Sequence, residues 1–377
     1  MKKKSRLIFV DLLRGWALLV MFEVHVFNSM LSPALKNTPW FGMLDFINGL
    51  VAPSFLFISG FAFNLSTKDK LDELRGFGPK FWKKIGRIAL IFLAGYSLHL
   101  PILSLRRLTH FYSYDVILRF YNVDILQCIA AGLLIMFVLR ILISSEKVYL
   151  YVLSTAAVLV FILSPFTWSI DFAKHIPVAL ADYFNAMHGS FFPLFPWLGF
   201  LLAGGAAAKL YLKFKENDRE QKYILWITIS GLAAALAGQF FLSGIFPEWY
   251  RMIRPHPVFS IERLGYVLFL LGLMWYYAYY RKTEKTFVID IGRESLLVYW
   301  LHLQIIYRQF WNNQSLASIV DKSFGVIECI AVVIALALLM IVVAKAWGKF
   351  KREHRNTASN LTFGIVSLCI VIFLIGF

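Results

Sequence analysis

The chain has 377 residues, of which 59% are hydrophobic and only 16% are charged, and its mean hydropathy is +0.67. No soluble domain could bury that much apolar surface, so the composition excludes a soluble globular protein and indicates an integral membrane protein. The net charge of +16 could suggest nucleic acid as a partner, but the basic residues lie mainly in short connections between apolar segments. We therefore expect the lipid bilayer as a partner, and no nucleic acid.

Eleven apolar runs are long enough to cross about 30 Å of hydrocarbon. The predicted fold class is all-α, a polytopic bundle of about 10–11 transmembrane helices in a single membrane domain over residues 1–377. In chain order the runs lie near 7–30, 43–65, 84–103, 122–143, 148–166, 192–212, 223–243, 258–280, 290–311, 323–347 and 359–377. Without the last of these spans, the C-terminus would stay on the same side as the N-terminus.

Lysine and arginine are concentrated in alternate connections. Of the 38 basic residues, 27 lie in the connections 2–6, 66–87, 140–147, 209–222, 281–293 and 345–355, and the intervening connections hold eight. Because cytoplasmic connections carry an excess of basic residues, the chain is predicted to be a multi-pass protein of the cell (cytoplasmic) membrane with its N-terminus in the cytoplasm. Charged residues interrupt the first run, so we expect it to be retained rather than cleaved as a signal peptide.

The first run contains Arg14 and His25, which apolar segments normally exclude. Eleven steps of about 100° bring His25 back to the face of Arg14, about 16 Å further along a helix. Asp11 and Asn28 fall on the same stripe. Ionisable groups at membrane depth cost at least ~2.5 kcal/mol each on insertion scales and usually face a cavity, so this stripe is the predicted site.

Metal chemistry is not indicated. The three cysteines, Cys128, Cys329 and Cys369, all fall within predicted spans, where we interpret them as core residues. No cluster of His, Asp or Glu has the spacing of metal ligands, so no metal is expected.

Several stretches resemble bacterial membrane acyltransferases related to heparan-α-glucosaminide N-acetyltransferase. The stretch RLIFVDLLRG at 6–15 resembles their first helix, and VAPSFLFISG at 51–60 resembles their second. Later signatures are similar to VDILQC at 123–128, FPWLG at 195–199 and IGRESLLVYWLH at 291–302. The resemblance implies a family core over about 6–311, followed by extra helices at 323–347 and 359–377.

The interval from Arg14 to His25 also resembles the first-helix motif of the wider acyltransferase-3 family, in which the histidine is the proposed catalytic residue. The chain departs from the glucosaminide enzyme, which has an asparagine in the slot of His25 and a catalytic histidine in the first outer connection. Here that connection, 31–42, contains no histidine. The resemblance therefore carries the fold and the acyl-CoA chemistry better than the heparan substrate.

The resemblance implies acetyl-CoA, or another acyl-CoA, as the donor. Its phosphates would need cations near the cytoplasmic face, which Arg14, Lys83, Lys84 and Arg87 can supply. His25 could remove a proton from an attacking hydroxyl or amine, or it could accept the acyl group itself. Asp11 could orient the Arg14 guanidinium or pair with it.

The implied acceptor is a saccharide or glycoconjugate reached from the outer side. Ser295, Tyr299 and His302 lie at i, i+4 and i+7 on one helical face, which favours a shared cavity. The full set of predicted acceptor-binding residues is Asp11, Asn28, Asp124, Gln127, Ser295, Tyr299 and His302.

Other interpretations stay open at this point. Arg14 and Asp11 could form an interfacial ion pair, and His25 could be a packed histidine bonded to a neighbouring helix. Buried Arg, His and Glu residues would equally serve a secondary transporter or flippase for an anionic metabolite. A non-catalytic sensor or scaffold would tolerate substitution of Arg14 and His25, whereas an enzyme would not. The oligomeric state does not follow from the sequence, because lipid-facing and partner-facing surfaces have similar compositions.

Overall fold

The computed structural model describes residues 7–68, 71–100, 104–106, 110, 113–282, 285–310 and 313–376. These residues form helices joined by turns, with one isolated bridge between Leu31 and Phe324. The predicted all-α class is confirmed.

The helices of the first half are α1 (Ile8–Met30), α2 (Pro33–Lys36), α3 (Pro39–Asn48), α4 (Val51–Thr67), α5 (Leu71–Arg75), α6 (Pro79–His99), α8 (Tyr114–Tyr121), α9 (Ile125–Leu142) and α10 (Glu146–Trp168). Those of the second half are the 3₁₀ turn η1 (Phe172–Lys174), α11 (Val178–Ala181), α12 (Leu194–Glu216), α13 (Glu220–Phe240), the π-helical η2 (Phe241–Ile245), α14 (Glu248–Arg251), α15 (Pro257–Arg281), α16 (Phe287–Arg293), α17 (Ser295–Tyr307), α18 (Leu316–Val320), α19 (Val326–Glu353) and α20 (Arg355–Ile375).

Eight segments among the described residues are long and apolar enough to cross a membrane, so the chain is a multi-pass membrane protein. They are α3–α4, α9, α10, α12, α13 with η2, α15, α19 and α20. The remaining predicted spans correspond to α1 and α6, which carry more charged residues, and to α16–α17, which is broken between Arg293 and Ser295.

Alternate helix ends define two faces of the bundle. We call the face where α1 begins, and where α4 and α12 end, the proximal face; α1, α6 and α10 end at the distal face. The predicted eleventh span, α20, starts beside the end of α19 and finishes near the connection that follows α6. There, a Cβ atom on Gly376 would lie 2.7 Å from Ser104 Oγ, so α20 runs from the proximal to the distal face.

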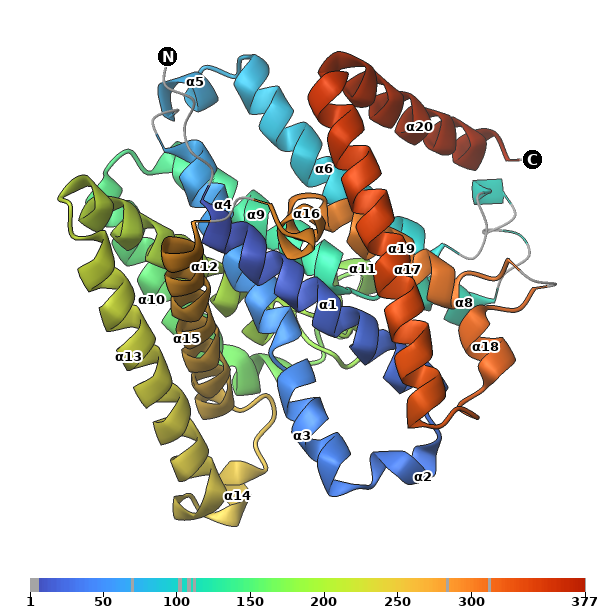
Figure 1. Cartoon of the computed structure of the whole chain (residues 1–377), viewed down its shortest axis with the longest axis horizontal. Coiled ribbons are helices and arrows are strands. Elements are labelled where there is room, and N and C mark those ends of the chain that lie inside the picture. Colours follow the sequence, from blue (N-terminus) through green and yellow to red (C-terminus); the bar gives the residue numbers. More distant parts are fainter. Residues whose placement is uncertain are drawn as a thin grey trace.

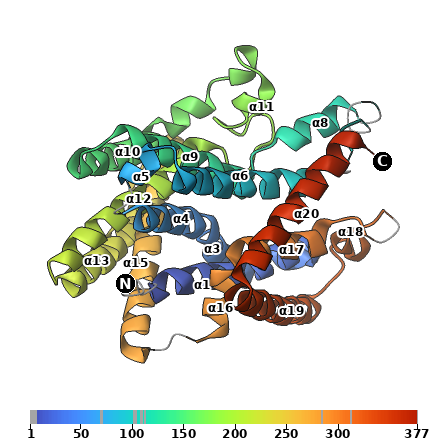
Figure 2. The same cartoon turned by 90° about the horizontal axis from the view of Figure 1, so that it is seen from above.

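Helix α1 runs through the middle of the bundle. Figure 1 shows it between α13 and α15 on one side and α19 on the other, and in Figure 2 it also lies among other helices. It contacts α4, α15, α16, α17 and α19. Polar groups on α1 therefore face protein rather than lipid, in accord with the cost of exposing charge to hydrocarbon.

Glycines allow some of these helices to approach closely. A Cβ atom on Gly60 of α4 would lie 1.9 Å from the Leu201 carbonyl oxygen of α12, and one on Gly204 would lie 1.9 Å from that of Phe57. Small residues at helix contacts are the usual means of close packing in membranes, where no hydrophobic effect drives helices together. The α4–α12 pair thus forms a rigid wall beside α1.

Candidate active site

A cavity of about 830 Å³ lies between α1, α4, α6, α9, α12 and α17, toward the proximal face. Its charged lining consists of five cations and one anion, namely Arg14, Lys68, Lys84, Arg87, Lys215 and Asp11. Its hydroxyl-bearing lining consists of Ser59, Ser66, Tyr211, Ser295 and Tyr299. This excess of positive charge suits an anionic ligand that carries phosphates.

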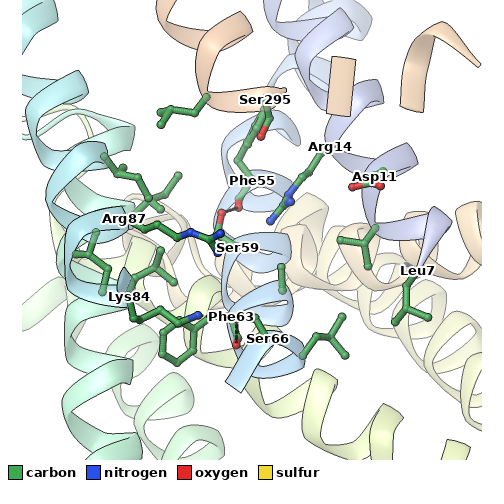
Figure 3. Close-up of a pocket in the computed structure, with 18 of the residues that line it drawn as sticks. Leu7, Asp11, Arg14, Phe55, Ser59, Phe63, Ser66, Lys84, Arg87 and Ser295 are labelled. Atoms are coloured by element: carbon green, nitrogen blue, oxygen red, sulfur yellow. Dashed lines mark hydrogen bonds between the residues drawn. The ribbon is translucent and has the colours of Figure 1, made fainter. Parts of the chain in front are cut away.

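Two arginines converge in the middle of the cavity. Arg14 extends from α1 and Arg87 from α6 toward the region of Ser59 on α4 (Figure 3). Lys84, one turn before Arg87, donates a hydrogen bond to Ser66 Oγ at 2.7 Å. Each guanidinium group presents a fork of N–H donors that matches the oxygens of a phosphate, and the lysine adds a point charge.

The end of the cavity near the proximal face is bordered by ion pairs. Lys68 at the end of α4 pairs with Glu216 at the end of α12. Lys215 Nζ lies 3.1 Å from a carboxylate oxygen of Glu220 and donates to the Tyr211 hydroxyl at 3.1 Å. These contacts hold the cationic side chains near the cavity, where they remain able to meet an entering anion.

Asp11 is held by a close crossing of α1 and α16. A Cβ atom on Gly15 would lie 2.0 Å from the Val288 carbonyl oxygen, and one on Gly292 would lie 1.9 Å from that of Asp11. The crossing brings Arg293 Nε to 3.4 Å from Asp11 Oδ2. Because the Asp11 side chain is almost fully buried, this charge partner offsets the cost of burying the carboxylate.

Tyr299 connects the cavity to a second polar region. Its side chain lines the cavity together with Ser295, one turn earlier on α17. On its other side, the Tyr299 ring lies edge-on to the His302 ring, with centroids 5.5 Å apart. The His302 ring lies 5.4 Å from that of His25 on α1. Tyr299 and His302 therefore stand between the cavity and His25.

His25, His302 and Tyr307 form a cluster in the distal half of the bundle. His25 Nδ1 lies 3.2 Å from the Tyr307 hydroxyl, which donates to the His25 carbonyl oxygen at 3.4 Å. The hydroxyl oxygen then accepts from Nδ1–H, and this tautomer leaves Nε2 of His25 with its lone pair available. Tyr307 thus orients the ring in the form that a base or nucleophile needs.

His302 is completely buried. Its Nδ1 donates to the Val298 carbonyl oxygen at 2.9 Å, so the neutral ring carries its proton there. Its Nε2 is buried without a hydrogen-bond partner among the described residues. Buried polar atoms usually have a hydrogen-bond partner, and a bound ligand or water could donate a hydrogen bond to this nitrogen.

Asp124 lies close to this cluster from α9. Its carboxylate caps the helix by accepting from the Ile125 amide at 2.7 Å, and it lies 3.6 Å from His99 Nε2. It is near enough to His25, Tyr299 and Tyr307 to interact with each electrostatically. Gln127 is fully buried in the same helix, where its amide oxygen packs against Gly95 of α6 rather than lining the cavity.

Two predicted site residues lie elsewhere. Asn28 is exposed, and its carbonyl oxygen accepts from Lys36 Nζ at 2.9 Å. Lys83 is also exposed and does not line the cavity, whereas its neighbour Lys84 and Arg87 do. On α6, Arg87 lies about 60° from Lys84 and about 40° from Lys83 around the helix axis, so helical spacing alone does not separate the two lysines.

Several site residues were not indicated by the sequence. Lys68 and Lys215 lie at ends of spans, where ordinary interfacial lysines also occur, and Tyr307 follows His302 by five positions. Ser59 lies in the stretch 51–60, and the resemblance of that stretch to the family's second helix is the sequence feature that could have indicated it. Within the described ranges, no group of three or more His, Cys, Asp or Glu side chains could hold a metal ion.

A comparison with family models finds a match for this chain. The model described as heparan-alpha-glucosaminide N-acetyltransferase, catalytic, matches residues 6–239, which is more than half of the chain. The match runs from just before α1 into α13, so it includes Arg14, His25 and the α6 cations but not α17. Residues 240–311, which the sequence motifs also assign to the family core, lie outside it. No curated protein matches the chain.

Proposed function

Because the chain belongs to the heparan-α-glucosaminide N-acetyltransferase catalytic family, we propose that it transfers an acetyl group from acetyl-CoA to a saccharide or glycoconjugate at the other side of the membrane. The supporting observation is a cationic cavity lined by Tyr299, whose ring contacts His302, which in turn contacts His25. The concentration of basic residues in connections at the proximal face supports a cytoplasmic location for that face. The donor would then enter from the cytoplasm.

The cations that line the cavity would bind the acetyl-CoA donor. Arg14, Lys84 and Arg87 would bind the phosphates of the CoA moiety, while the uncharged pantetheine arm would extend along the apolar lining toward Tyr299. This arrangement leaves the thioester at the distal end of the cavity. The surrounding bundle would keep bulk water away from the thioester before the acceptor arrives.

His25 is the proposed catalytic residue. As general base, its Nε2 takes the proton from the acceptor hydroxyl or amine while the acceptor oxygen or nitrogen attacks the acetyl carbonyl, and CoA leaves as the thiol. As nucleophile, Nε2 itself attacks the carbonyl and expels CoA as the thiolate; the acceptor then takes the acetyl group from the ring, and the acceptor proton passes to the thiolate. Asp124 would stabilise the positive charge that develops on the imidazole in either route.

The test uses purified protein in detergent and compares wild type with Arg14→Ala and His25→Ala for acetyl-CoA binding and hydrolysis. We expect saturable binding by wild type, weaker binding by Arg14→Ala, and binding without turnover by His25→Ala. Absence of binding at millimolar acetyl-CoA would overturn the proposal and direct attention to transport of an anionic metabolite.

A further inference from the structure

A second pocket adjoins the cavity at the proximal face. It has a volume of about 850 Å³ and lies between the start of α1, the α12–α13 connection and the last turns of α15. Leu7 and Lys215 line both this pocket and the cavity. The two spaces are therefore neighbours, and one elongated ligand could occupy both.

Glu220 connects the linings of the two spaces through hydrogen bonds and an ion pair. Its carboxylate accepts hydrogen bonds from Trp275 Nε1 at 2.8 Å and from the Tyr211 hydroxyl, and it lies 3.1 Å from Lys215 Nζ. Tyr211 faces the cavity, and Trp275 faces the second pocket. One carboxylate thus holds side chains in the linings of both spaces.

Tyr279 presents a flat aromatic surface in this pocket. One face of its ring stacks on Trp275, with centroids 4.9 Å apart and an interplanar angle of 13°. Its hydroxyl accepts a hydrogen bond from Gln221 Nε2 at 2.7 Å. The Tyr280 ring lies nearly perpendicular to it, with centroids 5.4 Å apart, yet Tyr279 remains 47% exposed. A held aromatic ring with this much exposed surface can stack on a nucleobase.

Charged residues surround the Tyr279 ring. Lys215, Arg219 and Lys222 contribute positive charge, and Asp218 and Glu220 contribute negative charge, of which Glu220 is already engaged. A phosphate would bind the cations, while Asp218 could accept hydrogen bonds from ribose hydroxyls or a base amino group. Aromatic stacking beside a net positive charge matches a nucleotide better than an apolar ligand.

We propose that this second pocket binds the adenosine 3′-phosphate end of the donor, with the base stacked on Tyr279 and the phosphate near Arg219 and Lys222. This assignment rests on the proposed acetyl-CoA-dependent function. Leu7 and Lys215, which line both spaces, would then flank the diphosphate where the ligand crosses from one space to the other. The pantetheine arm then continues into the cavity toward Tyr299.

The test measures dissociation constants of acetyl-CoA, 3′,5′-ADP and S-acetylpantetheine for the full chain in detergent. Tyr279→Leu removes the ring and should weaken acetyl-CoA and 3′,5′-ADP binding about 5- to 100-fold, the range of single-base stacking. S-acetylpantetheine, which has no adenosine, should bind unchanged. Tyr279→Phe keeps the ring and should resemble wild type. Tyr277→Leu is the matched control, because Tyr277 is exposed and does not line the pocket.

The outcomes separate this inference from the proposed function. Equal acetyl-CoA affinity in wild type and Tyr279→Leu would overturn the adenosine subsite and leave the proposed function standing. Binding of 3′,5′-ADP that does not compete with acetyl-CoA would show that a free nucleotide occupies the pocket, and would likewise overturn the donor assignment. Failure of wild type to bind acetyl-CoA would overturn both.

Discussion

The two halves of α1 have contrasting surroundings. Arg14, in the proximal half, lines a cavity of about 830 Å³ together with four other cations, whereas His25, in the distal half, packs against the rings of His302 and Tyr307. A phosphate-bearing ligand needs space and positive charge. Proton transfer needs neighbours that fix a tautomer and exclude water. One face of one helix can therefore supply two different functions, because the neighbouring helices differ along its length.

The largest expected effect comes from removing the basic nitrogen at the distal end. His25→Gln keeps a polar side chain of similar reach but cannot act as base or nucleophile, so turnover should fall by about 10²- to 10⁴-fold. The acetyl-CoA dissociation constant should stay as in wild type, since the proposed phosphate site lies at the other end of α1. Single-turnover kinetics and equilibrium binding together measure both quantities. His175→Ala, an exposed histidine outside the cluster, is the control; retained turnover in His25→Gln would contradict the division of roles.

The proximal end is examined with a matched pair on α6. Arg87→Ala removes a cation from the cavity and should weaken acetyl-CoA binding about 10- to 100-fold, the range of hydrogen bonds to charged groups. Turnover at saturating donor should change much less. Lys83→Ala removes a cation four positions earlier that is exposed and outside the cavity, so its dissociation constant should match wild type. Equal weakening by both variants would mean that general surface charge, rather than the cavity, attracts the donor.

A third comparison concerns the helix crossing that supports the cavity. Gly292→Ala would place a methyl group 1.9 Å from the Asp11 carbonyl oxygen, so α16 must move away from α1. We expect a loss of about 1–3 kcal/mol in the free energy of unfolding, typical of overpacking, seen as a lower midpoint of thermal unfolding. Gly86→Ala on α6 meets nothing within 4 Å and should leave the midpoint unchanged or slightly higher. No difference between the two variants would refute the close crossing.

The smallest expected effect is a pH dependence in the distal connection between α10 and α12. Asp182 is fully buried there, both of its carboxylate oxygens lack a hydrogen-bond partner among the described residues, and burial raises its pKa to about 6. The folded connection favours the protonated form, so this contribution to stability is complete below the unfolded pKa of about 3.9 and is lost as the pH rises through about 6.

Asp182→Asn cannot ionise, so hydrogen exchange in the segment 169–192 should be slower than in wild type at pH 7.5 and similar at pH 4.

Asp171 provides the opposite case, because its hydrogen bond with His188, 3.1 Å long, lowers the pKa of the carboxyl. That contribution is lost as the pH falls, so Asp171→Asn should speed exchange mainly at neutral pH. Identical pH profiles for the two variants would contradict these assignments.

The membrane fold and much of the proximal site could be predicted from the sequence alone. Hydropathy is a property of each segment, and spans must satisfy their own backbone hydrogen bonds as helices, so the all-α multi-pass class follows from local composition. Arg14 could be placed because helical spacing puts it on one face with Asp11 and His25. Lys84 and Arg87 could be placed because donor phosphates would need cations near the cytoplasmic end of a span. The same spacing could not show that Lys83 and Asn28 point away from the site, because that depends on which face each helix turns toward its neighbours.

Tertiary packing places the polar residues of α1 in two different environments, the cavity around Arg14 and the ring cluster around His25. Arg293 reaches Asp11 and Tyr307 reaches His25 across 282 positions of sequence, and the apolar composition of α16 and α17 does not indicate which helix they will meet. The second pocket likewise depends on α15 folding back beside the α12–α13 connection. The helices and the chemical groups that each carries follow from the order of residues within each segment. Only packing determined which groups meet, because in a membrane many apolar faces are chemically alike and shape complementarity selects among them.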